Sequence, residues 1–185
     1  MTRHSLLILL LSTCALPLLA QQSPLALGLE FQAYPTGLIP GIRLDYRLSP
    51  HHSLHARAGY NWVRHGDNGV QDDEQGQGYG GTLGYRYFFR PENRRWFVGG
   101  RVDFWRNQLD WQDLSPDGVL LATGTSRITV FQPTAEAGYR FLLAGGHIYL
   151  APALAFGMEI NVNTEGEPVG EGAILLLGLS AGWQF

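Results

Sequence analysis

Arginines and carboxylates recur at alternate positions through the middle of the chain, and they set the chemistry that the sequence can support. Every basic side chain is arginine, since none of the 13 Lys and Arg residues is lysine. A planar guanidinium with five N–H donors forms multidentate pairs with carboxylates. The candidate residues are Glu30, Arg43, Asp45, Arg57, Arg86, Arg101, Asp103, Glu136, Arg140 and Glu159. Gathered on one face of a fold, they predict a charge network that nearly neutralises itself.

The same charges allow a second interpretation, in which a switch of ion-pair partners opens a narrow path for ions. His55 falls on the same predicted face and would be a pH-sensitive member of such a gate. The structural interpretation is favoured, because buried charges of both signs satisfy one another without any transport role.

Acidic residues gather between the segments that carry this pattern. Ten of the 16 acidic residues lie there, namely Asp67, Asp72, Asp73, Glu74, Asp110, Asp113, Asp117, Glu165, Glu167 and Glu171. Solvation of the connecting segments explains such clusters, and capture of a divalent cation or of a basic partner is the functional alternative. Their spacing does not match an EF-hand, which argues against a dedicated calcium loop.

Catalytic and cofactor-binding patterns are weak. A Ser nucleophile would need a His base close to it in the fold. His65 with Ser126 is the one such pair that the elements predicted below bring to the same end of the fold. The only cysteine is Cys14, and no phosphate loop, dinucleotide loop or His/Cys metal cluster occurs. A net charge of -3 gives no general attraction to nucleic acid. We therefore expect no enzyme, cofactor, metal site or nucleic-acid partner.

Strict alternation of apolar and polar residues indicates the elements that must position these groups. Period-two patterns bounded by turn residues predict β-strands. Eight such segments occur, at residues 27–34, 41–48, 54–64, 79–89, 96–106, 128–141, 147–160 and 173–185. The fold class is therefore all-β.

The connections alternate in length. Short ones are predicted at 49–53, 90–95 and 142–146, longer ones at 65–78, 107–127 and 161–172, and the first, 35–40, is compact. Short turns at one end and longer loops at the other are typical of an antiparallel up-and-down barrel that crosses a membrane. In that arrangement both chain ends lie on the side of the short turns.

Alternation defines two faces without saying which one points inward. A soluble lipocalin-like carrier would line its cavity with the apolar face, whereas a transmembrane barrel would turn that face to lipid. Small residues such as Gly59, Gly84 and Gly99 share the charged face, and small side chains suit the confined interior of eight strands. Aromatic residues fall at the ends of the apolar face, as two interfacial girdles require: Tyr60, Trp62, Tyr87, Phe89, Trp96, Phe104, Phe131, Tyr139, Phe141 and Trp183. These features favour the transmembrane barrel.

The two ends of the chain agree with export. Residues 1–20 combine Arg3 and His4 with an apolar run and a cleavage site before Gln21, which predicts a removable signal peptide and a barrel domain over 21–185. A lipoprotein signal ending at Cys14 is the weaker alternative, because no small Gly or Ala precedes that cysteine. The chain closes on Trp183, Gln184 and Phe185, an uncharged aromatic end.

In its export signal, strand count, loop alternation, aromatic girdles and closing residues, the whole mature chain resembles the small eight-stranded bacterial outer-membrane barrels, the group that includes OmpX and the OmpA transmembrane domain. The resemblance implies a closed barrel in the cell outer membrane of a Gram-negative bacterium. It also implies contact with outer-membrane lipid and lipopolysaccharide, and an assembly signal at Phe185 read by the outer-membrane assembly machinery. A structural or surface-interacting role follows; a narrow channel or hydrophobic-ligand conduit, and a lipid A-modifying barrel enzyme, are the alternatives.

Overall fold

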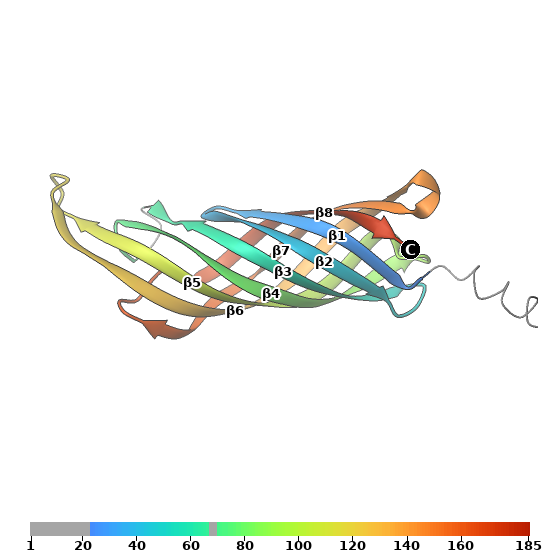
Figure 1. Ribbon diagram of the computed structural model, residues 1–185, viewed down its shortest axis with the longest axis horizontal. Helices are drawn as coiled ribbons and strands as arrows, with labels where there is room; N and C mark the ends of the chain where they lie inside the picture. The colour runs from blue at the N-terminus through green and yellow to red at the C-terminus, as the bar shows by residue number, and fades with distance from the viewer. Residues whose placement is uncertain (1–22, 67–69) are drawn as a thin grey trace, which may run out of the picture.

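The computed structural model describes residues 23–66 and 70–185, so the predicted signal peptide and Asp67 lie outside the described residues. Eight strands each pair antiparallel with the next, and the last pairs with the first, which closes a barrel (Figure 1). The strands are β1 Leu25–Tyr34, β2 Gly37–Arg47, β3 His52–Arg64, β4 Asp73–Arg90, β5 Arg94–Leu114, β6 Leu120–Leu143, β7 Ile148–Glu165 and β8 Gly172–Gln184. The predicted all-β, antiparallel, eight-stranded up-and-down barrel is confirmed.

Closure depends on the pairing of β1 with β8, which runs from Ala26 opposite Gln184 to Ala33 opposite Leu177. A sheet closed in this way has no unpaired edge along the shared wall, and that is the condition for strands to cross a bilayer. One short 3-10 turn, η2 Ala144–Gly146, joins β6 to β7. Within residues 23–66 and 70–185, no helix has the length and apolarity to span a membrane.

Side chains alternate strictly between the inside and the outside of the barrel. Leu83 and Leu177 point outward and are 66% and 62% exposed, whereas Arg43 and Glu136 point inward and are 0% and 4% exposed. Apolar residues outside and charged residues inside invert the polarity of a soluble barrel. A soluble carrier with an apolar cavity would show the opposite arrangement.

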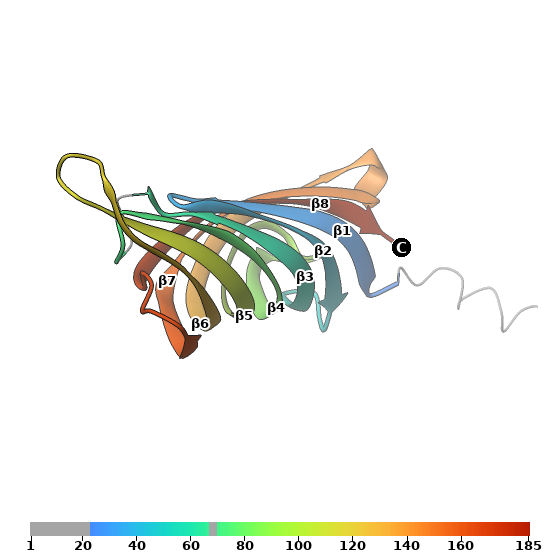
Figure 2. The same ribbon diagram turned by 60° about the vertical axis from the view of Figure 1, so that its left-hand side comes forward.

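The wall is much taller on one side than on the other. β1 and β2 have 10 and 11 residues, whereas β5 and β6 have 21 and 24. The hairpin of β5 and β6 therefore projects at the end of the molecule opposite the chain termini, which Figure 1 and Figure 2 show on the left. We call the end with this hairpin the outer end and the end with the termini the inner end.

Several predicted boundaries are wrong on this taller side. β4 begins at Asp73 instead of residue 79, β5 ends at Leu114 instead of 106, β6 begins at Leu120 instead of 128, and β7 ends at Glu165 instead of 160. β4, β5, β6 and β7 continue to pair with one another beyond the apolar band, so the strands extend into segments that were predicted as loops. Half of the predicted loop acids therefore lie in strands: Asp73, Glu74, Asp110, Asp113 and Glu165.

The first connection is also shorter than predicted. Only Pro35 and Thr36 separate β1 from β2, and Pro40 lies within β2 opposite Phe31. The two prolines made 35–40 resemble a loop in sequence. The register instead holds Gly37 to Pro40 in the wall, which leaves a tight outer turn between the first two strands.

Candidate functional site

Glu30, on β1, is the hub of a layer of ion pairs across the middle of the barrel. Its Oε1 accepts from Arg57 Nη1 at 3.2 Å and from Arg101 Nη1 at 3.4 Å, and its Oε2 accepts from Arg43 Nη1. Gln32 Nε2 also donates to Oε1, at 2.5 Å. A carboxylate on one strand is thus tied to β2, β3 and β5 at once.

Two further carboxylates extend this layer. Asp45 accepts from Arg43 Nε and Nη2, both at 3.0 Å, and from the Tyr149 hydroxyl at 3.0 Å. Asp103 accepts from Arg57 Nη2 at 2.8 Å and pairs with Arg101 Nε at 3.2 Å. The bidentate Arg43–Asp45 pair lies within β2, whereas the Tyr149–Asp45 and Arg57–Asp103 contacts join different strands and fix them relative to one another.

Glu136 and Arg86 form a further bidentate pair in this layer, with Nε–Oε1 and Nη2–Oε2 distances of 2.7 and 2.8 Å. The Arg86 guanidinium also lies 4.2 Å from the centre of the Phe97 ring. Arg140 is held differently, since its guanidinium lies 3.9 Å from the centre of the Tyr149 ring. Stacking on an aromatic face is a favourable place for a weakly hydrated guanidinium.

The structure brings nine of the ten predicted network residues into this central charged layer, which consists of Glu30, Arg43, Asp45, Arg57, Arg86, Arg101, Asp103, Glu136 and Arg140. The tenth, Glu159, is half-buried near the outer end beside Tyr34, His65 and Glu171. Its inclusion in the network is wrong, because its position near the outer end of β7 puts it beyond the arginines. His55 is buried at the level of the layer, with Gly84 on β4 leaving room for its ring.

The layer also contains uncharged polar side chains that were not among the predicted site residues. Thr134 Oγ1 accepts from Arg101 Nε at 3.0 Å, and Gln32 Oε1 accepts from Arg101 Nη2 at 3.1 Å. Thr82 Oγ1 accepts from Arg57 Nε at 3.0 Å. Each of these side chains has the same inward parity as the charges, so the alternation could have identified them.

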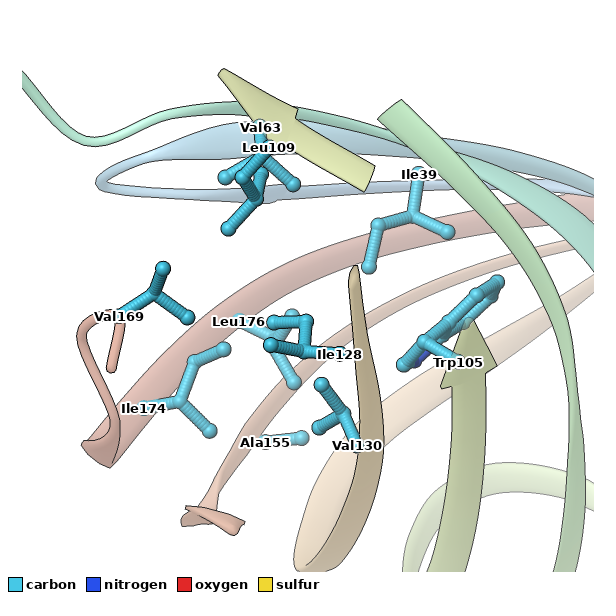
Figure 3. Packing of buried hydrophobic residues seen from close by; sticks show 10 residues of the cluster. All are labelled: Ile39, Val63, Trp105, Leu109, Ile128, Val130, Ala155, Val169, Ile174 and Leu176. Carbon is cyan, nitrogen blue, oxygen red and sulfur yellow. The ribbon is translucent and has the colours of Figure 1, made fainter. Parts of the chain in front are cut away.

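Apolar clusters close the interior on both sides of the charged layer, which differs from the expected polar interior. The outer cluster is shown in Figure 3 and consists of Ile39, Val63, Trp105, Leu109, Ile128, Val130, Ala155, Val169, Ile174 and Leu176. The inner cluster consists of Ala26, Phe88, Phe97, Tyr149 and Ala151. Glycines make room for the large rings, since a Cβ on Gly80 or Gly138 would overlap Trp105 or Phe97.

The β7–β8 loop, residues 166–171, covers the outer end of the barrel. Val169 is 3% exposed and packs into the outer cluster, as Figure 3 shows. The loop backbone is anchored on three sides: Pro168 O accepts from Gln71 Nε2 at 2.9 Å, Glu167 O from Ser126 Oγ at 2.8 Å and Val169 O from Asn161 Nδ2 at 3.2 Å. This segment belongs to the longer connection predicted at 161–172, and it forms a cap.

Glu74 ties the cap to the β3–β4 connection. Its Oε2 lies 2.5 Å from His65 Nδ1 and 3.4 Å from Gly170 N, and its Oε1 accepts from the backbone N–H groups of Val70 and Gln71 at 2.7 and 3.2 Å. Burial raises the pKa of Glu74, but the hydrogen bonds from His65 and the two backbone amides outweigh burial, so the pKa lies below its ordinary value. Glu74 is fully buried, not part of an exposed acidic rim.

His65 and Ser126, considered above as a base and a nucleophile, have different partners. His65 is occupied by Glu74, and the Ser126 hydroxyl donates to Glu167 O. In the part of the chain that the structure describes, no group of three His, Cys, Asp or Glu side chains could hold a metal ion.

The interior has little free volume between these layers. One cavity of about 10 Å³ lies among Glu30, Arg86 and Ser180, and another of about 10 Å³ lies near Asp45 and Arg140 at the inner end. A single water needs roughly 10–15 Å³ of such volume. Side chains therefore fill the barrel, with no room for a continuous water column at these two levels.

All ten predicted girdle residues point away from the interior, at two levels. Toward the outer end, the rings of Tyr60 and Trp62 meet edge to face with centroids 5.3 Å apart, and those of Phe104 and Phe131 lie 5.1 Å apart. Toward the inner end, rings are in contact in the pairs Tyr87–Phe89, Trp96–Tyr139 and Tyr139–Phe141, and Trp183 stacks on His147. Phe185, the predicted assembly signal, is 58% exposed beside them.

No protein-family model matches the chain, and no curated protein sequence matches it. Among solved structures, the chain is similar to the N-terminal β-barrel domain of Pseudomonas aeruginosa OprF, with 14% identity and a TM-score of 0.50 over 89% of this chain and 100% of that one. It is also similar to Ail of Yersinia pestis, solved in complex with the heparin analogue sucrose octasulfate (10% identity, TM-score 0.48, 87% and 96% covered), and to neisserial surface protein A (12%, 0.48, 87% and 94%). The architectural resemblance to small eight-stranded outer-membrane barrels is confirmed; at these identities it concerns the fold.

Proposed function

We propose that this chain is an integral protein of a bacterial outer membrane, with a closed barrel as the anchor and the tall outer hairpin as the working surface. The observation that carries this proposal is the inverted polarity of the wall. Large apolar side chains such as Leu83 and Leu177 are more than 60% exposed, while Arg43 and Asp103 are fully buried. Only a hydrocarbon surrounding makes that arrangement favourable.

The filled interior supports an anchor instead of a conduit. Three layers block the axis in turn: the inner cluster, the central charged layer and the outer cluster with its cap. A conducting path would need all three to open. We therefore expect no stable single-channel conductance from the refolded protein in planar bilayers, and steady conductance steps would contradict the closed anchor.

The working surface is the part of the β5–β6 hairpin beyond the barrel wall. β6 pairs with β7 only from Arg127 onward, whereas it pairs with β5 from Leu120. The tip combines Asp117 with the exposed apolar residues Val119, Leu120 and Leu121. Exposed apolar groups flanked by acid are suited to contact with a partner that offers basic and apolar side chains.

Membrane insertion and orientation are tested together. The refolded protein should migrate differently on gels with and without boiling, and should stay with membranes after carbonate washing. An epitope inserted at Asp117–Gly118 should be labelled on intact cells. The matched control is the same epitope at Gly145–Gly146, in the inner turn η2, which should be labelled only after permeabilisation. Equal labelling of both sites on intact cells would refute the orientation.

A further inference from the structure

Three arginines line a concave surface on the outside of the wall toward its outer end. The hollow has a volume of about 890 Å³ and is lined by Arg64 at the end of β3, by Gln75 and Gln77 on β4, by Arg106 on β5 and by Arg127 on β6. The register makes these side chains neighbours, since Arg64 lies opposite Gln75 and Gln108 lies opposite Arg127. They belong to the lipid-facing side of their strands, not to the interior.

The distribution of charge makes this surface distinctive. The other arginines of residues 23–66 and 70–185 lie in the central charged layer or at the inner end, so every described arginine of the outer end is in this hollow. Arg64 and Arg106 make no ion pair or hydrogen bond with another described side chain, and Arg127 Nε donates only to Gln108 Oε1 at 3.3 Å. The one carboxylate in the lining, Asp110, accepts from Thr125 Oγ1 at 2.6 Å.

The surface changes from charged to aromatic to apolar in the direction of the inner end. Tyr79 lies opposite Arg106 and is 65% exposed, and the Tyr60–Trp62 pair borders the same hollow. Below them come the exposed apolar residues Phe104 and Leu83. Guanidinium groups bind phosphate through several hydrogen bonds, amphipathic rings prefer the interface, and an apolar wall accommodates acyl chains.

We propose that this hollow binds the phosphorylated sugar headgroup of an outer-leaflet glycolipid. Arg64, Arg106 and Arg127 contact phosphate oxygens, Gln75 and Gln77 hydrogen-bond to hydroxyl or amide groups of the sugars, and Trp62 and Tyr79 pack against the sugar faces. The acyl chains then run along the apolar wall. The inference rests on the proposed function, because only an outer-membrane orientation brings such a lipid to this level.

The test uses the detergent-solubilised, refolded protein and native mass spectrometry with bisphosphorylated lipid A as the probe. The variant combines Arg64→Gln, Arg106→Gln and Arg127→Gln. The matched control combines Arg90→Gln, Arg94→Gln and Arg95→Gln, which removes the same charge from the inner end. We expect the first variant to bind at least tenfold more weakly than the wild type and the control to bind like the wild type. Dephosphorylated lipid A should bind at least tenfold more weakly to the wild-type protein.

Each contrary result has a distinct meaning. A smaller loss in the Arg64, Arg106 and Arg127 variant, or equal binding of dephosphorylated lipid A, overturns the headgroup site. Complete displacement of the lipid by excess inorganic phosphate also overturns it, in favour of a site for free anions. Heat-dependent gel migration is measured on the same samples. Wild-type protein that lacks this shift refutes the membrane proposal itself, whereas a shifted protein that does not bind lipid A refutes only the lipid site.

Discussion

The central charged layer and the outer cluster both close the barrel, but they do so with opposite chemistry. In the charged layer, Glu30 and its arginines connect strands that are not neighbours. In the outer cluster, Trp105, Leu109 and the capping Val169 pack without polar contacts among them. The interior is filled in both places. The difference between charged and apolar filling therefore depends on whether lipid or water surrounds the wall at that level.

The surroundings explain this division. In the proposed membrane orientation, lipid surrounds the wall at the level of the charged layer, so moving an apolar side chain inward gains little, while directional polar contacts fix the strands. Toward the outer end the strands rise into water, where burying Leu109 or Ile174 removes apolar surface from solvent. Position along the barrel axis thus selects which force closes the interior.

The largest expected effect comes from breaking the charged layer at its hub. Glu30→Leu leaves three buried guanidinium groups short of a partner, which should lower the free energy of unfolding by about 3–5 kcal/mol. Urea unfolding in lipid vesicles, followed by tryptophan fluorescence, measures this loss. The matched control is Leu29→Ala on the lipid-facing side of the same strand, and equal losses in the two variants would contradict the assignment of faces.

A cavity in the outer cluster should cost less. Leu109→Ala removes a fully buried side chain, and the expected loss is about 2–3 kcal/mol. Leu83→Ala, on the lipid-facing side of β4, is the comparison and should change stability less. The same unfolding measurement applies. If Leu109→Ala proved harmless, the outer cluster would not be a packed core.

The cap should respond to pH through Glu74. The pKa of this carboxyl is lower in the folded protein than in the unfolded chain, so its contribution is present above the unfolded value and is lost as pH falls through the folded value. The protection factors of the amides in residues 166–171, which take account of the slower intrinsic exchange in acid, should therefore decrease below about pH 4, the ordinary carboxyl range. Glu74→Gln should weaken the cap at pH 7 by about 1–2 kcal/mol and remove this acid response. An unchanged acid response in the variant would exclude Glu74 as its source.

Asp72→Asn should have the smallest effect. Asp72 is exposed, and its Oδ2 accepts from Leu114 N at 2.7 Å, a contact that an amide oxygen can replace. We expect a change within about 0.5 kcal/mol in the unfolding experiment. A loss as large as that of Leu109→Ala would mean that the outer hairpin carries stability that its exposure does not suggest.

Alternation predicted the strand number, the faces and nine members of the charged layer, because period two follows directly from strand geometry. The same pattern places Phe88, Phe97 and Trp105 on the inward face with the arginines. A few apolar residues among many charges did not by themselves predict that they form clusters. The strand ends and the cap lay beyond its reach. They depend on contacts such as Gln71 with Pro168, which no local pattern encodes.

The position of Glu30 in the first strand has a consequence for biogenesis. Its partners arrive with the second, third and fifth strands, the last of them 71 residues later. A partly assembled barrel that holds only the early hairpins would expose unpaired charge to the bilayer. The free energy of such an intermediate is therefore high, and it falls when the later strands supply the ion-pair partners. The ion pairs of Glu30 are thereby completed only when the first five strands have assembled.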